Sequence, residues 1–112
     1  MLERHLNQWY NGPAMEVLFV DPALALLETD EAGKTKLPVP VIKSARRKLT
    51  VLRAATDDRS LRNWKSLHYE KLKGDRAGLR SVRLNDQFRM VFSLDESTNP
   101  QTVTILAIED YH

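Results

Sequence analysis

Five polar side chains in the last third of the chain carry groups that could act on a phosphodiester. They are two arginines and the three residues that end the sequence: Arg83, Arg89, Asp110, Tyr111 and His112. Guanidinium groups bind and neutralise phosphate, and imidazole, phenol and carboxylate groups transfer protons. RNA carries its own nucleophile, the 2′-hydroxyl, so this set predicts a site that cleaves RNA without a metal ion. A frayed terminus is an equally good interpretation of the last three residues taken by themselves.

Other kinds of catalytic site find little support in the sequence. The absence of Cys excludes disulfides, a thiolate nucleophile and a Cys-based zinc site, and only three His remain as nitrogen ligands. The chain has no Gly-x-Ser-x-Gly elbow, no acidic cluster with metal-ligand spacing, and no Walker loop around Gly74 and Gly78. We therefore expect neither a metal ion nor a cofactor.

The charged residues are distributed unevenly along the chain. A net charge of +2 combines acidic ends with a basic middle, since residues 34–89 hold sixteen basic and five acidic side chains. The resulting segment charge of +11 favours a polyanionic partner. Nucleic acid fits better than membrane, because no stretch is both strongly amphipathic and rich in aromatic residues. Charge alone fits solvated helix faces equally well.

Two alternating strands on either side of Asn85-Asp86-Gln87 predict a β-hairpin. A two-residue loop would mix the apolar and polar faces, so we expect these three residues to form the loop. That register places Arg83 directly opposite Arg89. Like charges that face each other destabilise a sheet by a fraction of about 1 kcal/mol. A phosphate between the guanidiniums would remove this cost, as would turning both of them to water or to an acid such as Asp110.

The remaining pattern predicts one small α+β domain. The expected elements are a strand at 15–20, a helix from Pro22 to Gly33, a helix from Val41 to Ala55, a short helix or turn at 57–65, and strands at 79–84, 88–94 and 102–109. We expect a small antiparallel sheet of the N-terminal strand and the three C-terminal strands, with two main helices packed on one face. The last strand is nearly all apolar, which predicts a central strand covered on both faces.

Residues 1–14 are polar and precede these elements, so we interpret them as an N-terminal extension of a domain that spans residues 15–112. No apolar stretch approaches the roughly 20 residues that a membrane-spanning helix needs, and no signal segment opens the sequence. We therefore expect a cytoplasmic protein with no membrane partner.

Three sequence blocks follow one another in the second half of the chain. They are Leu-Lys-Gly-Asp-Arg at 72–76, Asn-Asp-Gln-Phe-Arg at 85–89 and the Asp-Tyr-His ending. With this order and spacing, the chain resembles the HigB toxins, also called plasmid maintenance or proteic killer proteins, of the RelE/ParE toxin superfamily. The resemblance covers residues 15–112, and the joint match is specific although each block alone is weak.

The resemblance implies a RelE-like microbial RNase fold and the function of a toxin in a type II toxin-antitoxin system. Such a toxin is a ribosome-dependent, metal-independent endoribonuclease that cleaves mRNA in the A site, with the RNA 2′-hydroxyl as nucleophile, and so arrests translation and growth. The implied partners are the ribosome, mRNA and a HigA-like helix-turn-helix antitoxin. Operator DNA would be bound only through the complex with the antitoxin.

The same resemblance implies roles for individual residues. Asp110, Tyr111 and His112 match residues tied to catalysis, and Arg89 matches an arginine that binds the scissile or adjacent phosphate. Further cations are expected to hold the RNA backbone through salt-sensitive electrostatics; they are Arg83, Lys71, Lys73 and Arg76.

One position departs from the family pattern. Some relatives place a catalytic His just before the Leu-Lys-Gly-Asp block, where this chain has Glu70, with His68 two residues earlier. Either residue, or neither, would then assist proton transfer. Taken alone, His68 lies between Leu67 and Tyr69 and fits a structural role better than a catalytic one.

Two alternative functions are compatible with the same fold. One is a ParE-like toxin that poisons DNA gyrase by binding and has no nuclease activity, and the other is a detoxified member that only binds its antitoxin. The terminal Asp110-Tyr111-His112 and Arg89 favour the nuclease, because a protein that only binds would not require them.

Overall fold

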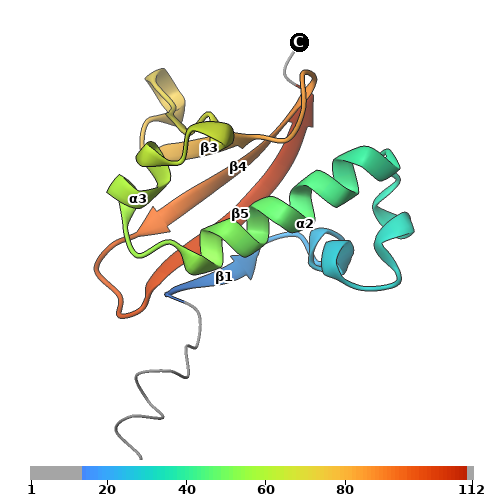
Figure 1. The fold of residues 1–112 in the computed structure, drawn as a ribbon, viewed down its shortest axis with the longest axis horizontal. Coiled ribbons are helices and arrows are strands. Elements are labelled where there is room, and N and C mark those ends of the chain that lie inside the picture. The colour runs from blue at the N-terminus through green and yellow to red at the C-terminus, as the bar shows by residue number, and fades with distance from the viewer. Residues whose placement is uncertain (1–13, 111–112) are drawn as a thin grey trace, which may run out of the picture.

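The computed structural model describes residues 14–110, which form a five-stranded sheet with helices on one side (Figure 1). The strand order is β1-β5-β4-β3-β2, with bounds Met15–Phe19 for β1, Glu70–Lys71 for β2, Leu79–Arg83 for β3, Phe88–Asp95 for β4 and Gln101–Asp110 for β5. Neighbouring strands are antiparallel, except that β1 and β5 are parallel. The predicted α+β fold is confirmed, and β2 is a short fifth strand that the sequence did not indicate.

One long helix, α2 (Val39–Ala54), lies across the sheet (Figure 1). It carries Pro40 in its first turn, where the missing N–H would have no helical partner. The short helix α3 (Asp58–Asn63) follows, and its N-cap Asp57 accepts a hydrogen bond from the backbone N–H of Ser60 at 2.8 Å. Both helices agree with the sequence pattern.

The helix predicted from Pro22 is shorter than expected. It is a 3₁₀ helix, Leu24–Glu28, followed by a second 3₁₀ turn at Ala32–Thr35. Leu24 and Leu27 are its buried residues, and their spacing of three matches the three residues per turn of a 3₁₀ helix. The sheet is therefore covered by one main helix rather than two.

The hydrophobic core lies between α2 and the sheet. Residues of α2 at helical spacing pack against alternate residues of the strands, and each is almost completely buried: Val41, Ala45, Leu49 and Leu52 on the helix, and Met90, Phe92, Val103 and Ile105 on the sheet. Burying one such side chain contributes ~1.5–3 kcal/mol. This packing makes the sheet a rigid platform whose other face, opposite α2, is called the open face below.

The hairpin of β3 and β4 has the predicted register. Val82 pairs with Met90, and Arg83 pairs with Arg89. The side chain of Asn85 closes the loop, because its Oδ1 accepts hydrogen bonds from two backbone N–H groups across the loop, at 2.8 and 2.7 Å. The two arginines thus project from adjacent strands onto the open face.

A β-bulge interrupts the alternation of β5. Val91 pairs with Ala107, but the next residue of β4, Phe92, pairs with Ile105, so Leu106 is an extra residue. Before the bulge the odd-numbered residues of β5, such as Ile105, face the helices, and after it the even-numbered ones, such as Ile108, do so. The apolar run of the last strand reflects this change of phase.

The bulge decides which terminal acid shares a face with Arg89. Beyond it, Glu109 pairs with Arg89 and Asp110 pairs with Phe88. Because successive residues of a strand point to opposite faces, Glu109 lies on the open face and Asp110 on the helix-covered face. β5 is inside the sheet, as predicted, but residues 106–109 are only partly buried. Its predicted coverage on both faces is wrong, because the helices cover one side of the sheet (Figure 1).

Candidate active site on the open face of the sheet

Arg89 is the most buried charged side chain of the open face, with 9% of the side chain exposed. Its Nε donates a hydrogen bond to Ser81 Oγ at 2.8 Å, and its Nη2 donates to the backbone carbonyl of His68 at 2.6 Å. The same Nη2 lies 3.7 Å from Glu70 Oε1. A buried guanidinium requires such partners, because its desolvation is costly. These contacts hold the Arg89 group in one orientation.

A small hollow surrounds this arginine. It is lined by residues of the β2–β3 segment and of the three central strands: Leu72, Arg76, Ser81, Arg89, Val91 and Glu109. Across it, Arg76 Nη2 donates to Glu109 Oε2 at 2.7 Å, in an ion pair whose two side chains are about 40% exposed. The hollow therefore brings together two arginines and a carboxylate from segments more than thirty residues apart.

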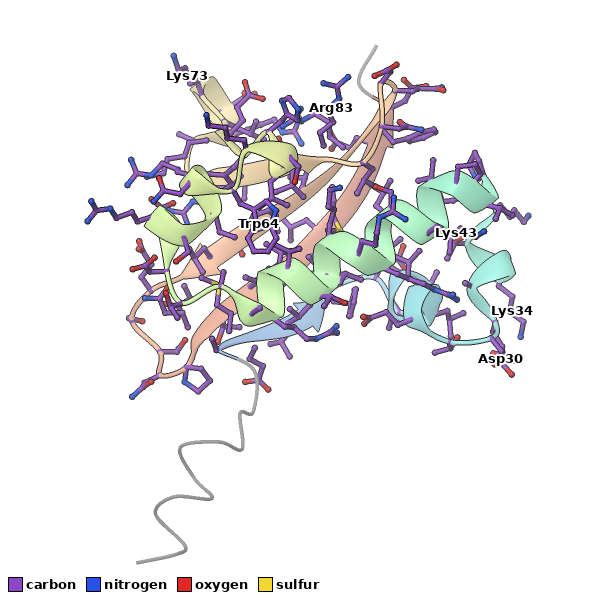
Figure 2. The ribbon with its side chains drawn as sticks, in the orientation of Figure 1. Asp30, Lys34, Lys43, Trp64, Lys73 and Arg83 are labelled. Atoms are coloured by element: carbon purple, nitrogen blue, oxygen red, sulfur yellow. The ribbon has the colours of Figure 1, made fainter. Side chains whose placement is uncertain are left out.

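Arg83 turns away from Arg89 although the two residues are paired. Its Nη2 donates to the Asp86 carboxylate, and its Nε donates to the carbonyl of Asn85 at 3.2 Å. Figure 2 shows Arg83 at the loop end of the hairpin. The repulsion expected between the opposed guanidiniums is thus avoided by separate partners, and the acid that meets Arg83 is Asp86 rather than the predicted Asp110.

The other predicted phosphate-binding cations are divided among three places. Arg76 lines the hollow with Arg89. Lys73 is exposed in the segment between β2 and β3 and points away from the body of the molecule (Figure 2). Lys71 pairs with Asp58 at 3.5 Å on the helix-covered side. Of these three cations, Arg76 is the one that lines the hollow of the open face.

Glu70 and His68 contribute different groups to the site. Glu70 pairs with Ser81 in the sheet, so its carboxylate lies on the open face and approaches Arg89. His68 has a left-handed backbone, with φ of 47°, and holds Arg89 through its carbonyl oxygen. Of the two residues considered for proton transfer, Glu70 is the one whose ionisable group is directed at the arginine.

The residues at the C-terminus are described only in part. Asp110 accepts a hydrogen bond from Gln87 Nε2 at 3.0 Å, which joins the end of β5 to the hairpin loop. Tyr111 and His112 lie outside the described residues, as do residues 1–13 of the predicted extension. The last residues of β5 lie at the same end of the sheet as Arg83, because Glu109 pairs with Arg89 and Arg89 pairs with Arg83. The Glu109 side chain lies on the open face.

A polar cluster on the helix-covered side supports the segment that carries Glu70. Tyr69 donates a hydrogen bond from its hydroxyl to Asp58 Oδ1, and Arg62 Nε lies 3.1 Å from Asp58 Oδ2. Burial disfavours the Asp58 carboxylate, but the hydroxyl of Tyr69 and the charges of Lys71, Arg62 and Arg80 outweigh it and lower the pKa of Asp58. Burial and the hydrogen bond to Asp58 raise the pKa of Tyr69. The cluster therefore stays as a carboxylate and a neutral phenol at neutral pH.

The sequence interpretation missed three contributors to the site. Ser81 shares a face with Arg83 in the hairpin register, so the alternation that was used for the arginines could have found it. Glu109 could not be found this way, because its face depends on the bulge. Asp58 meets Tyr69 only through tertiary packing, for which the sequence carries no periodic signal.

The arrangement suits the binding of an anion together with proton transfer. Arg89 offers a fixed guanidinium and Arg76 a second one, and the carboxylates of Glu70 and Glu109 flank them. Among residues 14–110 no group of His, Asp and Glu has the geometry of a metal site. No helix in that range is long and apolar enough to span a membrane.

Comparison with known proteins identifies the family. A family model described as the RelE-like toxin HigB of type II toxin-antitoxin systems matches residues 18–112. The chain belongs to the HigB-like toxins. The resemblance proposed from the three sequence blocks is confirmed, and this HigB-like chain is therefore a toxin of the type II class. No curated protein matches it.

Solved structures of related toxins share the fold. YafQ from E. coli strain BL21(DE3) aligns with a TM-score of 0.61 and 8% identity, over 87% of this chain and 93% of YafQ. The YoeB/ParE toxin from Agrobacterium tumefaciens aligns with a TM-score of 0.51 and 17% identity, over 88% and 100%. The YoeB-YefM complex from Staphylococcus aureus gives a TM-score of 0.51 and 20% identity, over 88% and 97%. At these low sequence identities, the similarity to the three structures concerns the fold alone.

Proposed function

We propose that this HigB-like toxin is a ribosome-dependent endoribonuclease that cleaves mRNA in the ribosomal A site and thereby stops translation. Its site would be the hollow of the open face, with Arg89 at the centre. The observation that carries the proposal is the fixed, buried guanidinium of Arg89 beside the Glu70 carboxylate. A guanidinium held before the substrate arrives stabilises developing phosphate charge without reorganisation.

The proposed reaction is an internal transfer of the phosphodiester. The 2′-oxygen of the RNA forms a bond to phosphorus while the bond from phosphorus to the 5′-oxygen breaks. Glu70 takes the proton of the 2′-hydroxyl, His112 donates a proton to the leaving 5′-oxygen, and Arg89 stabilises the pentacoordinate phosphorane. The products are a 2′,3′-cyclic phosphate and a 5′-hydroxyl. The transfer uses no metal ion or cofactor. Tyr111 is proposed to assist His112 at the site, and Asp110, which accepts a hydrogen bond from Gln87, is proposed to assist by holding the end of β5 against the hairpin loop.

The ion pairs of Arg76 and Arg83, one in the hollow and one at the hairpin loop, are compatible with RNA binding. Arg76 is bound to Glu109, and Arg83 to Asp86, but all four side chains are more than a third exposed. Exposed ion pairs contribute only ~0–1 kcal/mol, so RNA phosphates can displace these carboxylates at little cost. Lys73 adds a cation on the neighbouring segment, and we expect this electrostatic contact to weaken as salt is added.

We further propose that a HigA-like helix-turn-helix antitoxin neutralises this toxin in the cytoplasm and that operator DNA is bound only through the resulting complex. Support comes from the family, whose model describes a toxin of a toxin-antitoxin system, and from the YoeB neighbour, which is in a complex with YefM. A co-purification of the toxin with the product of the adjacent reading frame tests this partner. A stable complex with a helix-turn-helix protein is expected.

Induction of toxin variants in cells tests the nuclease proposal. We expect wild type to arrest growth and to cut mRNA at codons in the A site, and we expect Arg89→Ala and His112→Ala to do neither. Arg47→Ala is the matched control, because Arg47 is an exposed arginine on α2, which packs on the other face of the sheet. Equal mRNA cleavage by all four proteins would remove the proposed site. DNA damage with continuing translation would instead favour the gyrase-poisoning alternative.

A further inference from the structure

We propose that Asp58 and Tyr69 are positioning residues that fix Arg89 and Glu70 from the opposite side of the sheet. The inference rests on the function proposed above, since it concerns how the same site is held in place. Neither residue lies on the open face, so neither would touch the RNA. Their effect would pass through the backbone of residues 68–70.

The first step is the anchoring of Tyr69. Its hydroxyl donates to Asp58 Oδ1, and its ring stacks on Phe92 with a centroid separation of 6.2 Å. Phe92 is fully buried, and Asp58 is 8% exposed. Tyr69 is therefore attached at both its ring and its hydroxyl to groups that cannot easily move.

The second step is the orientation of His68. This residue has a left-handed backbone, with φ of 47°, which few non-glycine residues adopt. Its neighbours Leu67 and Tyr69 both pack toward the core, and Leu67 is fully buried. Held between two anchored side chains, His68 directs its carbonyl oxygen to Nη2 of Arg89, at 2.6 Å.

The third step is the placement of Glu70. It follows Tyr69 directly. Tyr69 packs against the core on the helix-covered side, whereas Glu70, the first residue of β2, pairs with Ser81 and directs its carboxylate to the open face. The anchor on Tyr69 therefore also sets the position of the Glu70 carboxylate, 3.7 Å from the Arg89 guanidinium. Two ligands of Arg89, one carbonyl and one carboxylate, thus depend on a single anchored residue.

The charges around Asp58 keep this anchor in place. Arg62 at 3.1 Å and Lys71 at 3.5 Å both contact Asp58 Oδ2, which leaves Oδ1 for the hydroxyl of Tyr69. The Lys71 ion pair also connects the short strand β2 directly to Asp58 of α3. Lys71, one of the cations expected to bind RNA, therefore also contacts a carboxylate on the helix-covered side.

Side-chain NMR and cleavage kinetics together test the proposal on the full-length toxin. The probe is the Nε–H signal of Arg89, assigned by its loss in Arg89→Lys. In Tyr69→Phe, which keeps the ring and removes the hydroxyl, we expect this signal to shift and to exchange with solvent about tenfold faster. Single-turnover cleavage on programmed ribosomes is expected to fall about tenfold at saturation, with the half-saturating ribosome concentration within about twofold of wild type.

Two Asp58 variants and one control complete the test. Asp58→Asn keeps an oxygen that can accept the hydrogen bond from the Tyr69 hydroxyl, so its Arg89 signal is expected to stay close to that of wild type. In Asp58→Ala, which has no such oxygen, the Arg89 signal is expected to shift. Arg62→Ala removes a contact of Asp58 but not the hydrogen bond of Tyr69, and it is expected to leave the Arg89 signal as in wild type. Asp58→Asn also carries the test if Tyr69→Phe does not fold.

An unchanged Arg89 signal in folded Tyr69→Phe and Asp58→Ala would overturn the proposal. A shift of the Arg89 signal that is equally large in Asp58→Asn and Asp58→Ala would also overturn it. A wild-type protein that cuts no mRNA would overturn the nuclease function alone, because the NMR signal reports the position of Arg89 whether or not the protein is an enzyme.

Discussion

Removing the hydroxyl of Ser81 tests how firmly the structure holds Arg89. Ser81 is 1% exposed, and its Oγ accepts the Nε–H of Arg89 at 2.8 Å. In Ser81→Ala that donor loses its acceptor in a place that water hardly reaches, because the Arg89 side chain is itself only 9% exposed. Hydrogen bonds to charged groups contribute ~1.5–3 kcal/mol, so we expect a loss of ~2 kcal/mol in the free energy of unfolding. For a domain of this size that loss lowers Tm by about 8 °C.

Urea unfolding of a double-mutant cycle separates this contact from other effects of the substitution. The cycle contains wild type, Ser81→Ala, Arg89→Met and the double variant. Once Arg89 is Met, the serine has no charged donor to satisfy, so Ser81→Ala is expected to cost less than ~0.5 kcal/mol in that background. Ser93→Ala is the control, because Ser93 is a partly buried serine on β4 whose side chain lies on the same face of the sheet as Arg89. It is expected to change stability by no more than ~0.5 kcal/mol.

The cycle refutes the reasoning if the two single changes are additive. A coupling of ~1.5 kcal/mol between Ser81 and Arg89 is expected, and additivity within ~0.5 kcal/mol would mean that the hydrogen bond does not hold the guanidinium. An effect of Ser93→Ala as large as that of Ser81→Ala would assign the loss to the hydroxyl itself.

Three further predictions concern catalysis, pH and salt. Glu70→Gln should lower the rate of mRNA cleavage by ~10²-fold or more, as loss of a general base does, whereas His68→Ala should keep it within about threefold; equal losses would remove the preference for Glu70. The contacts of Asp58 lower its pKa below the ~3.9 of an unfolded chain, so its carboxylate stabilises the fold above that pH and ceases to do so as pH falls through the folded-state pKa. The stability advantage of wild type over Asp58→Asn should therefore shrink below about pH 4 in urea unfolding, and an advantage that grows with acid would contradict this. Lys73→Ala should reduce the slope of log affinity for ribosomes against log salt by about one, with no change in codon preference.

The hairpin shows what the sequence could predict. Its polar and apolar residues alternate strictly, and a shift of one residue would send charges into the core, so only one register agrees with burial. The pairing of Arg83 with Arg89 followed from that constraint and is confirmed. The pattern of α2 was equally clear, since its buried residues repeat at steps of three and four.

The last strand shows where the prediction stopped. Residues 105–108 are all apolar, and a continuous apolar run carries no phase, so the extra residue at Leu106 could not be located from the sequence. That single residue moves Glu109 to the face of Arg89 and Asp110 to the other face. The prediction for the segment after Pro22 was wrong for a related reason, because buried leucines three residues apart fit an α-helix and a 3₁₀ helix alike.

The family assignment and the site came from different kinds of information. Three short blocks identified the HigB-like toxins, and the family match confirms them. The partners of Arg89 come from Ser81, from the carbonyl of His68 and from Glu70, which lie up to 21 residues away in the chain. A backbone carbonyl leaves no mark in a sequence, so this part of the site required the fold.

Mapping RNA ends on purified ribosomes is the most direct test of the nuclease function. Ribosomes programmed with a defined mRNA and mixed with the toxin should yield a cut inside the A-site codon, with a 2′,3′-cyclic phosphate upstream and a 5′-hydroxyl downstream. Arg89→Ala should slow this cut by ~10²–10³-fold, while Arg47→Ala leaves it unchanged. Intact mRNA with the wild-type toxin, or equal cleavage by Arg89→Ala, would contradict the proposal that the Arg89 hollow is the active site of an mRNA-cleaving toxin.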